Sequence, residues 1–448
     1  MVGGGISGLV CAHALRKSGI DAQLVESSPR PGGVIHSITR DGYLLELGPQ
    51  SFSSTPALRE LCAELGISSE LLQAPPRAPR YVLIDGKLQP VPLSPPAFFM
   101  SSLLDGSTKW AFVRDIFGKS IPPDDDESVA AFTRRKFSKQ FLDRLVGPFV
   151  SGIYAGDPER LSLRSAFPQL YEGEQSAGSI VRGMMRLAKS KKGPRERPTL
   201  QTFRRGNETL VHALANKLGP ALFTRTRVAA IARQDNGSLD VRLENQKGDE
   251  SISTRSLILA TPTDVAGMLL SQLDSSSQSP LSSIEYAAVA VVSLGYRKKD
   301  VGHSLNGFGF LVPRSASLRV LGSVWNSSLF PGRAPEGHAL LTSFVGGTTD
   351  PSATKLKPAE LASLVHREIS AVLSTKNEPV FSNVTIWPRA LPQYNLGHSD
   401  RLAAVAKSCS RFPGLWLTGN YLRGPAIGSC VDQALAVAEE VRAKLVPR

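Results

Sequence analysis

The first eight residues contain glycines at a spacing that can hold a diphosphate group. Gly3, Gly5 and Gly8 follow the pattern GxGxxG. In this pattern the first glycine permits a tight turn, the second lets a pyrophosphate approach the backbone, and the third packs a helix against a strand. Free N–H groups and the positive end of the helix dipole then hold the phosphates. Alone, the pattern is as compatible with an ordinary glycine turn as with a dinucleotide site.

A carboxylate and a second glycine pair follow the motif at a suitable distance. Glu26 ends the next expected strand about 20 residues on, where a carboxylate accepts both ribose hydroxyls of an adenosine cofactor. Arg30, Gly32 and Gly33 then supply a cation and two close-approach positions beside the same pyrophosphate. With all three features in register, the segment predicts a dinucleotide site more strongly than a structural turn.

Hydrophobic periodicity places these residues on half of a βαβ unit. The pattern predicts a helix from residue 9 to the glycine at 19 and a strand over 22–26. Further along, a strand at 200, a helix over 208–218, a strand around 228 and a buried strand over 257–262 indicate a return to this first domain. The last block, 415–445, reads as strand, glycine-rich turn and helix.

Two other regions have a different character. Residues 81–88 alternate around Asp85-Gly86, which predicts a hairpin, and the sequence from there to about 187 predicts an inserted, mainly helical domain. Residues 287–345 are rich in predicted strands and suit the floor of a large apolar pocket. The basic stretch KSKKGPRER, residues 189–197, predicts a surface loop between two lobes.

Composition limits the classes of protein and partner. The 448 residues carry a formal charge of +13, which favours acidic partners such as an anionic membrane surface or a carboxylated substrate, while no nucleic-acid module is recognisable. Four widely spaced cysteines predict buried thiols rather than disulfides or a zinc site. The sequence predicts neither a membrane-spanning helix nor a secretion signal, so we expect a cytoplasmic protein.

Several strings resemble one flavoprotein group. GGGISGLVCAHAL and LVESSPRPGGVIHS resemble the dinucleotide signature of the flavoprotein amine oxidase superfamily, which includes monoamine oxidases, phytoene desaturases and protoporphyrinogen oxidases. Five more strings are similar to the protoporphyrinogen and coproporphyrinogen III oxidase family. They are LELGPQSF from Leu45, FVSGIYAGDPERLSLRSAFPQL from Phe149, GFGFLVP from Gly307, TSFVGG from Thr342 and LPQYNLGH from Leu391.

This resemblance implies an α/β (mixed α+β) fold with a Rossmann-like FAD-binding domain, an inserted helical domain and a mixed-sheet substrate domain. The boundaries we expect are 1–75, 207–272 and 395–448 for the FAD-binding domain, 76–187 for a helical, membrane-associating domain, 188–206 for a linker and substrate-domain segment, and 273–394 for the substrate domain. It also implies peripheral attachment to the inner face of the cell membrane as an alternative to a purely cytoplasmic location, and a homodimer.

The resemblance implies roles for individual residues. The FAD site would contain Gly3, Gly4, Gly5, Ile6, Ser7, Gly8, Glu26, Ser27, Arg30, Gly33, Val34, Gly48, Pro49, Gln50, Ser51, Val228, Trp387, Pro425, Ala426 and Ile427. Arg80 is similar to an arginine that pairs with a substrate propionate, and a guanidinium suits a carboxylate. Phe344 resembles a ring that stacks on a pyrrole, and Leu311 and Val324 resemble an aliphatic pair around another. Each of these residues also has an ordinary packing interpretation.

The implied reaction is the six-electron oxidation of a porphyrinogen to the porphyrin, with FAD as cofactor and O₂ as acceptor. We assign no catalytic residue and no metal, and we expect His36, His303 and His398 to be structural or exposed. Protoporphyrinogen IX and coproporphyrinogen III stay open as substrates. Rival hypotheses are an amine oxidase or phytoene-desaturase-like enzyme, for which Cys430 lacks the expected context, and a non-catalytic carrier.

The sequence departs from the family pattern at two places. Relatives have a full strand before the first glycine, where this chain has Met1 and Val2, so we expect either an upstream start or an incomplete first strand. Residues 201–210 place Arg205 and Asn207 where the family tends to have paired glycines. That difference puts the tightness of the strand-to-helix turn in question.

Overall fold

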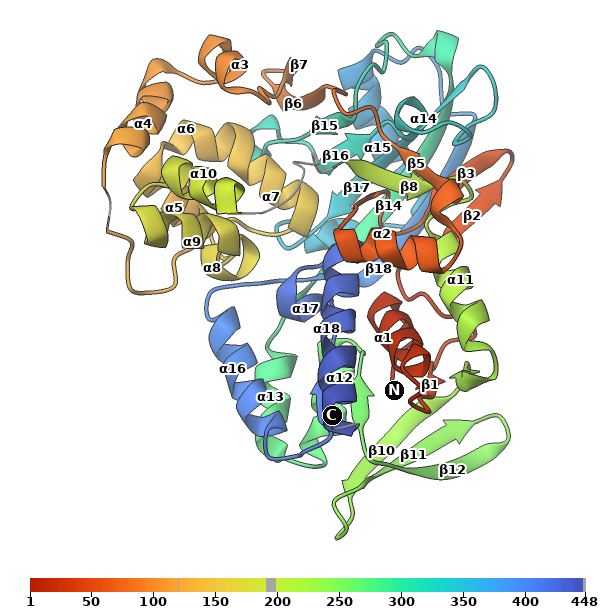
Figure 1. Cartoon of the computed structure of the whole chain (residues 1–448). Coiled ribbons are helices and arrows are strands. Elements are labelled where there is room, and N and C mark those ends of the chain that lie inside the picture. Colours follow the sequence, from red (N-terminus) through yellow and green to blue (C-terminus); the bar gives the residue numbers. More distant parts are fainter. Residues whose placement is uncertain (120, 191–198, 446–448) are drawn as a thin grey trace.

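The computed structural model describes residues 1–119, 121–190 and 199–445 (Figure 1). A small parallel sheet organises the first part of the molecule: β1 (Leu24–Val25) pairs with β9 (Leu222–Phe223), and β13 (Leu257–Leu259) pairs with β19 (Leu415–Leu417). Val2 joins the two pairs, because it bridges Val25 on one side and Leu259 on the other. Five short segments from separate parts of the chain therefore meet behind the first glycines.

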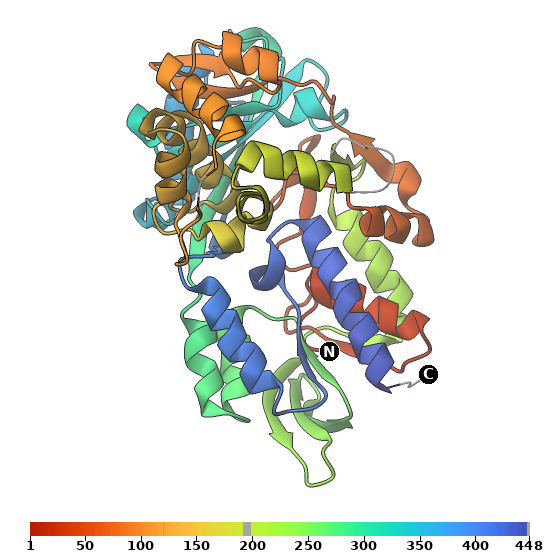
Figure 2. The same ribbon diagram turned by 60° about the vertical axis from the view of Figure 1, so that its left-hand side comes forward.

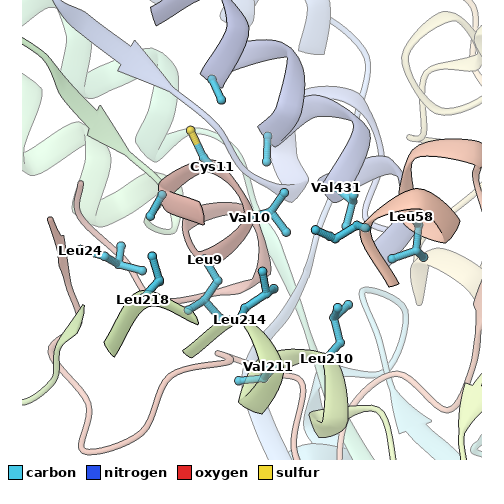
Figure 3. Packing of buried hydrophobic residues seen from close by; sticks show 14 of the residues in the cluster. Leu9, Val10, Cys11, Leu24, Leu58, Leu210, Val211, Leu214, Leu218 and Val431 are labelled. Carbon is cyan, nitrogen blue, oxygen red and sulfur yellow. The ribbon is translucent and has the colours of Figure 1, made fainter. Parts of the chain in front are cut away.

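Helices from three parts of the chain form the core beside this sheet. They are α1 (Ile6–Lys17), α2 (Pro56–Glu64), α11 (Glu208–Leu218) and α18 (Ile427–Leu445). Figure 3 shows Leu9 and Val10 of α1 close to Leu214 of α11 and Val431 of α18, all of them buried. Burying a side chain of this kind contributes about 1.5–3 kcal/mol, so this packing fixes where α1 begins.

A seven-stranded mixed sheet forms the second layer, in the order β18-β14-β17-β16-β15-β6-β7. Its strands are β6 (Arg80–Ile84), β7 (Lys87–Pro90), β14 (Tyr286–Arg297), β15 (Gly309–Leu311), β16 (Val320–Val324), β17 (His338–Gly346) and β18 (Phe381–Pro392). The predicted hairpin at Asp85-Gly86 is confirmed, since it joins β6 to β7 and both residues have positive φ. Helix α15 (Pro358–Leu373) packs on one face of this sheet.

Helices fill the segment between β7 and β8 (Leu200–Phe203), and Figures 1 and 2 show them gathered beside the large sheet. They are α3 (Pro95–Met100), α4 (Gly106–Phe117), α5 (Val129–Lys136), α6 (Lys139–Phe141), α7 (Gly147–Tyr154), α8 (Leu163–Ala166), α9 (Pro168–Ala177) and α10 (Ile180–Ser190). A π-helical turn, Leu142–Val146, separates α6 from α7. Within the described ranges, no helix is both long and apolar enough to cross a bilayer.

The remaining elements complete the sheet-and-helix frame. They are β2 (Ser37–Arg40), β3 (Tyr43–Glu46), β4 (Phe52–Ser53), β5 (Leu71–Gln73), β10 (Arg227–Arg233), β11 (Leu239–Asn245), β12 (Gly248–Thr254), α12 (Thr263–Ser271), α13 (Gln278–Ser282), α14 (Asn326–Leu329), α16 (His398–Cys409) and α17 (Asn420–Arg423). Strands β10–β12 form an antiparallel sheet that projects at the bottom of Figure 1.

The predicted elements agree with the structure in kind, with differences in length. The helix over 208–218 is confirmed at both ends. The strand expected over 22–26 covers only Leu24–Val25, because beyond it the Glu26 carboxylate accepts the Ser28 N–H and turns the chain. The predicted loop at 189–197 lies almost entirely outside the described residues. At the strand-to-helix turn near Asn207, Gly206 has φ +97° and the Asn207 N–H binds Glu46, so the turn is tight.

Candidate functional site

One cavity of about 1510 Å³ runs between the two sheets and into the helical segment. Its walls come from the N-terminal glycine segment, the face of the seven-stranded sheet, helix α7 and the turn before α18. A cavity of this size exceeds the usual range for one small ligand, roughly 300–1000 Å³. The space can therefore hold a cofactor and a substrate together.

One end of the cavity lies at the start of α1, where the backbone leaves donors unpaired. The first helical hydrogen bond joins the Leu9 N–H to the Gly5 carbonyl, and Gly5 contributes no side-chain cap. A Cβ on Gly3 would lie 2.7 Å from the Ala260 carbonyl oxygen, and one on Gly8 would overlap the Gly3 carbonyl. At Gly5 a Cβ would meet nothing within 4 Å. The first and third glycines thus allow close packing, and the second faces open space that suits a phosphate.

Glu26 is held with its carboxylate towards this end of the cavity. Its Oε2 accepts the Gly4 N–H at 2.6 Å, and its Oε1 accepts the Ser28 N–H at 2.7 Å. A carboxylate has about four lone-pair positions, so each oxygen can still accept a ribose hydroxyl. Two backbone donors fix the orientation of the group before any ligand arrives.

The segment Gly48–Ser51 forms the next part of the wall and is supported from behind. A Cβ on Gly48 would overlap the Val34 carbonyl, so the two chains lie as close as backbone permits. The Gln50 amide donates to the carbonyls of Glu46 and Gly48 at 2.8 and 2.9 Å. The Asn207 side chain donates to the Pro49 carbonyl at 2.7 Å. Hydrogen bonds from the Gln50 and Asn207 side chains therefore set the course of this wall.

Trp387 and the turn before α18 close the opposite side. The Trp387 indole N–H donates to the Leu47 carbonyl at 2.6 Å, which fixes the ring against the Gly48 segment. The turn is anchored by Tyr394, whose hydroxyl accepts the Gly424 N–H at 2.7 Å and donates to the Asn420 carbonyl. Helix α18 begins at Ile427, so its positive end faces the cavity.

The part of the cavity that lies on the large sheet is apolar, and we call it the apolar chamber. Phe344 on β17, Leu311 on β15 and Val324 on β16 all line it, and they come from three adjacent strands. Gly152 of α7 packs directly against one of them, since a Cβ there would lie 2.5 Å from the Leu311 side chain. The cavity is lined by residues of α7 as well as of the sheet, so a hydrophobic molecule in it would have apolar side chains of both around it.

Charged groups are few around the cavity and mostly positive. Among the described lining residues, the cations are Arg80, Arg144, Arg227 and Arg389. The acidic residue in that set is Glu26, and the set contains no histidine or lysine. Arg80 lies over the Phe308 ring, with its guanidinium carbon 5.6 Å from the ring centroid. The cavity is therefore suited to an apolar ligand with acidic substituents.

The predicted site residues converge on this one space. All of them line the cavity except Gly4, Gly8 and Arg30. Gly4 and Gly8 shape the turn behind it, and the Arg30 guanidinium donates to the Gly33 carbonyl at 2.7 Å and so holds its own loop. The individual roles assigned to these residues stay predictions.

Other residues near the cavity were not identified from the sequence. Asn420, Arg144 and Arg389 line it, and Tyr394 supports it. The LPQYNLGH string marked the position of Tyr394, but no local pattern indicates which distant turn its hydroxyl binds. Cys430 also lines the cavity, and burial raises the pKa of its thiol to about 11, so the group stays protonated at neutral pH.

These features fit an FAD molecule. The donors at the start of α1 suit the pyrophosphate, Glu26 suits the ribose, and the backbone near Val228 lines the space beyond it. The wall formed by Gly48–Ser51 and Trp387 leaves room for a ring system that continues towards the apolar chamber.

Comparison with known proteins agrees with this geometry. The model of the flavin containing amine oxidoreductase family matches residues 6–442. The chain is 35% identical to the chloroplastic protoporphyrinogen oxidase of Nicotiana tabacum, over 98% of this chain and 84% of that protein. It is 30% identical to the coproporphyrinogen III oxidase of Bacillus subtilis, over 98% of this chain and 97% of the relative.

Solved structures show the same architecture. A crystal structure from Exiguobacterium sp. 255-15, described as a candidate protoporphyrinogen oxidase, superimposes with a TM-score of 0.82 at 25% identity and covers 99% of this chain and 98% of its own. Putrescine oxidase, at 17% identity, gives a TM-score of 0.71 over 99% of this chain and 98% of its own. The second likeness concerns the fold alone.

Proposed function

The chain belongs to the flavin-containing amine oxidoreductase family, and from that premise we propose that it oxidises a porphyrinogen to the porphyrin with FAD as cofactor. The observation that carries the proposal is the single cavity. It joins a dinucleotide-binding end to an apolar chamber that bears arginines. A porphyrinogen is a large, mostly apolar macrocycle with carboxylate substituents, and it matches that chamber in character.

When bound, FAD supplies a two-electron acceptor, so a six-electron oxidation takes three rounds. The chain's own residues bind the substrate, orient it and shield it from water. The Phe344 side chain presents an apolar surface to one pyrrole ring, and the Leu311 and Val324 side chains present one to another, while residues of α7 line the same cavity. These contacts exclude water from the reacting carbon and hold it in a fixed orientation.

The cavity offers little for acid–base chemistry. Among the described lining residues, the carboxylate is Glu26, which lies at the ribose end and already accepts two backbone N–H groups. Histidines are absent from the described lining, and burial keeps the Cys430 thiol protonated. We infer that this protein contributes orientation and electrostatics, and that none of the described lining residues acts as a general base.

Arg80 is the proposed partner of a substrate carboxylate. It stands at the start of β6, lines the chamber and lies over the Phe308 ring. Ring stacking orients a guanidinium without using its N–H donors, which stay available for a bidentate contact with a propionate. Leu311 is paired with Val82, two residues further along β6, so the arginine and the proposed pyrrole contacts share one part of the sheet.

We propose peripheral membrane association through the helical segment. Large apolar side chains with substantial exposure gather there: Leu93, Phe99, Met100, Trp110, Phe117, Ile121, Phe149, Ile153 and Met185. Leu93, Phe149 and Ile153 also line the cavity, whereas the other exposed apolar side chains of this segment, in a chain of charge +13, suit contact with an anionic bilayer surface. O₂ as the electron acceptor and a homodimeric state are also part of the proposal, and they rest on the family resemblance.

Two other functions make different predictions. An amine oxidase would oxidise amines and leave porphyrinogens unchanged. A carrier would bind its ligand without turnover. The arginines of the chamber favour an acidic substrate over a cationic amine.

The test is to purify the protein, record its flavin spectrum and follow porphyrin fluorescence with protoporphyrinogen IX and with coproporphyrinogen III. Reactions under air and under nitrogen separate O₂ from other acceptors, and samples without protein correct for spontaneous oxidation. Enzyme-dependent fluorescence with bound FAD supports the proposal. A flavin-loaded protein that oxidises amines but neither porphyrinogen would contradict it.

A further inference from the structure

Two of the four arginines that line the cavity have a counter-ion and two do not. Arg227 pairs with Glu244 at 3.7 Å, and Arg389 pairs with Asp264. Among the described residues, Arg80 and Arg144 form no ion pair, although both line the same cavity. Hydrogen bonds from Thr108 and Ser107, and to a lesser extent the charge of Arg144, lower the pKa of Asp105. Neither guanidinium is within ion-pair distance of a carboxylate in the described ranges, so both can still bind a ligand anion.

Arg144 lies in the π-helical turn Leu142–Val146, directly before α7. Turns of this type are rare and occur often at functional sites. The Arg144 side chain is partly buried, and one of its terminal nitrogens donates to the Leu103 carbonyl at 2.9 Å. A guanidinium has five N–H donors, so this bond fixes its direction and leaves several donors unused.

Arg144 and Arg80 reach the cavity from elements that pack together. Strand β6 contacts the π-helical turn, and Val82 of β6 and Leu145 belong to one hydrophobic cluster. Arg80 and Val82 are two residues apart on the strand, so their side chains share a face. Arg80 is thus two residues from Val82, and Arg144 is directly before Leu145, so each arginine is close in sequence to a member of that hydrophobic cluster.

We propose that Arg80 and Arg144 together form a site for two carboxylates carried on one edge of the substrate macrocycle. The inference rests on the proposed porphyrinogen oxidation and names the class of substrate more narrowly. Arg144 is a partly buried cation beside apolar side chains, so it has lost hydration that a ligand anion can replace, whereas Arg80 is exposed. Each of the two guanidinium groups can bind one propionate through a charge-assisted hydrogen bond.

The charge distribution favours a dicarboxylic substrate over a tetracarboxylic one. Arg227 and Arg389 are already paired with acidic side chains, so they offer less to further carboxylates. A tetracarboxylic ring bound at Arg80 and Arg144 would bring its other two carboxylates towards the apolar part of the chamber. We expect that to be unfavourable.

The test measures binding of porphyrins rather than turnover. Dissociation constants are determined on the FAD-loaded protein, from quenching of protein fluorescence, for protoporphyrin IX, its dimethyl ester and coproporphyrin III. The variants are Arg144→Gln, Arg80→Gln and the double variant. Arg114→Gln is the matched control, because it removes an exposed arginine of α4 that does not line the cavity.

We expect Arg144→Gln to weaken binding of the diacid roughly tenfold or more and to leave the diester unchanged. Arg114→Gln should change neither, and the parent should bind the diacid more tightly than the tetra-acid. Arg144→Lys, which keeps the charge, should retain part of the preference for acid over ester, and it carries the test if the glutamine variant does not fold.

Equal weakening of diacid and diester in Arg144→Gln would assign Arg144 to the support of Leu103 and overturn the site. An unchanged diacid affinity would overturn it as well. A parent that forms porphyrin but binds acid and ester alike refutes this inference alone, whereas a parent that forms no porphyrin refutes the proposed function.

Discussion

The Tyr394 hydroxyl accepts the backbone N–H of Gly424 at 2.7 Å and so fixes a turn 30 residues further along the chain. The same hydroxyl donates to the Asn420 carbonyl. Gly424 has φ +128°, which favours glycine. The Tyr394 ring stacks on His398 at 4.5 Å, and His398 contacts the Tyr421 carbonyl at 2.8 Å. One buried tyrosine thus holds both ends of the turn that leads into the cavity wall before α18.

Removing this hydroxyl should loosen the wall on the cofactor side. We expect Tyr394→Phe to weaken FAD binding roughly tenfold, because two backbone groups lose their shared partner. Tyr421→Phe is the matched control, since its buried hydroxyl has no hydrogen-bond partner among the described residues. Fluorescence titration of the apoprotein with FAD gives both affinities. Equal affinities in the two variants would show that the Tyr394 bonds serve folding only.

Tyr394 also shows what sequence patterns can and cannot predict. The LPQYNLGH string was identified as a family feature, and the strand, turn and helix predicted for the later block 415–445 are present. Its hydroxyl partners were not predictable, because a contact over 26 to 30 residues depends on how β18, α17 and α18 pack. Motifs that bind through their own backbone, such as Gly3–Gly8, carry their geometry in local spacing and were easier to interpret.

Glu46 and Arg333 form a buried ion pair at 3.0 Å, and both side chains are 2% exposed. Ser37 and the Asn207 N–H also donate to the carboxylate, at 2.6 and 2.9 Å. Burial raises the pKa of Glu46, and the charge of Arg333 opposes that rise. The pair connects the segment before Gly48 with the loop that follows α14.

We expect Arg333→Met to destabilise the protein by about 3–5 kcal/mol, because it leaves an unpaired carboxylate in the interior. The double variant with Glu46→Gln should be less destabilised than the sum of the two single changes. Urea unfolding of the parent, the two single variants and the double variant gives the four unfolding free energies of a double-mutant cycle. If the two effects simply add, the ion pair does not couple the two segments.

The Glu46–Arg333 pair shows why part of the site could not be predicted from the sequence. Glu46 lies inside the recognised string LELGPQSF, yet Arg333 comes from an unremarkable loop 287 residues later. Composition could not indicate that this arginine is buried. The π-helical turn at 142–146 was not predicted either, because its apolar spacing resembles that of an α-helix.

His398 should make the stability of the protein depend on pH. Burial lowers its pKa from 6.5 to about 4, with Arg401 lowering it further and the Tyr421 carbonyl and Asp126 opposing. The unfolded chain therefore takes up the proton first. The contribution of the neutral His398 imidazole to the free energy of unfolding is fully present above about pH 6.5 and is lost as the pH falls towards 4.

That loss should be about 3 kcal/mol between pH 7.5 and 4. His398→Gln does not titrate and can still donate to the Tyr421 carbonyl, so its unfolding free energy should fall less over the same range. Urea unfolding at several pH values measures the difference between the two proteins, in which the shared carboxylates cancel. Parallel pH profiles would show that His398 is not the group responsible.

Phe344 and Val345 are adjacent on β17 and face opposite sides of the sheet. Phe344 lines the cavity, whereas Val345 is buried in the core on the α15 side. We expect Phe344→Ala to raise KM or lower kcat for a porphyrinogen at least roughly tenfold, because it removes a ring that can stack on a pyrrole, while FAD content stays unchanged. Val345→Ala should instead lower the free energy of unfolding by about 1–2 kcal/mol through a small cavity, with turnover retained. Steady-state porphyrin fluorescence and urea unfolding separate the two effects. Loss of flavin or of folding in Phe344→Ala would place that ring in the structural core, and the pyrrole contact would then have to be assigned to other residues of the chamber.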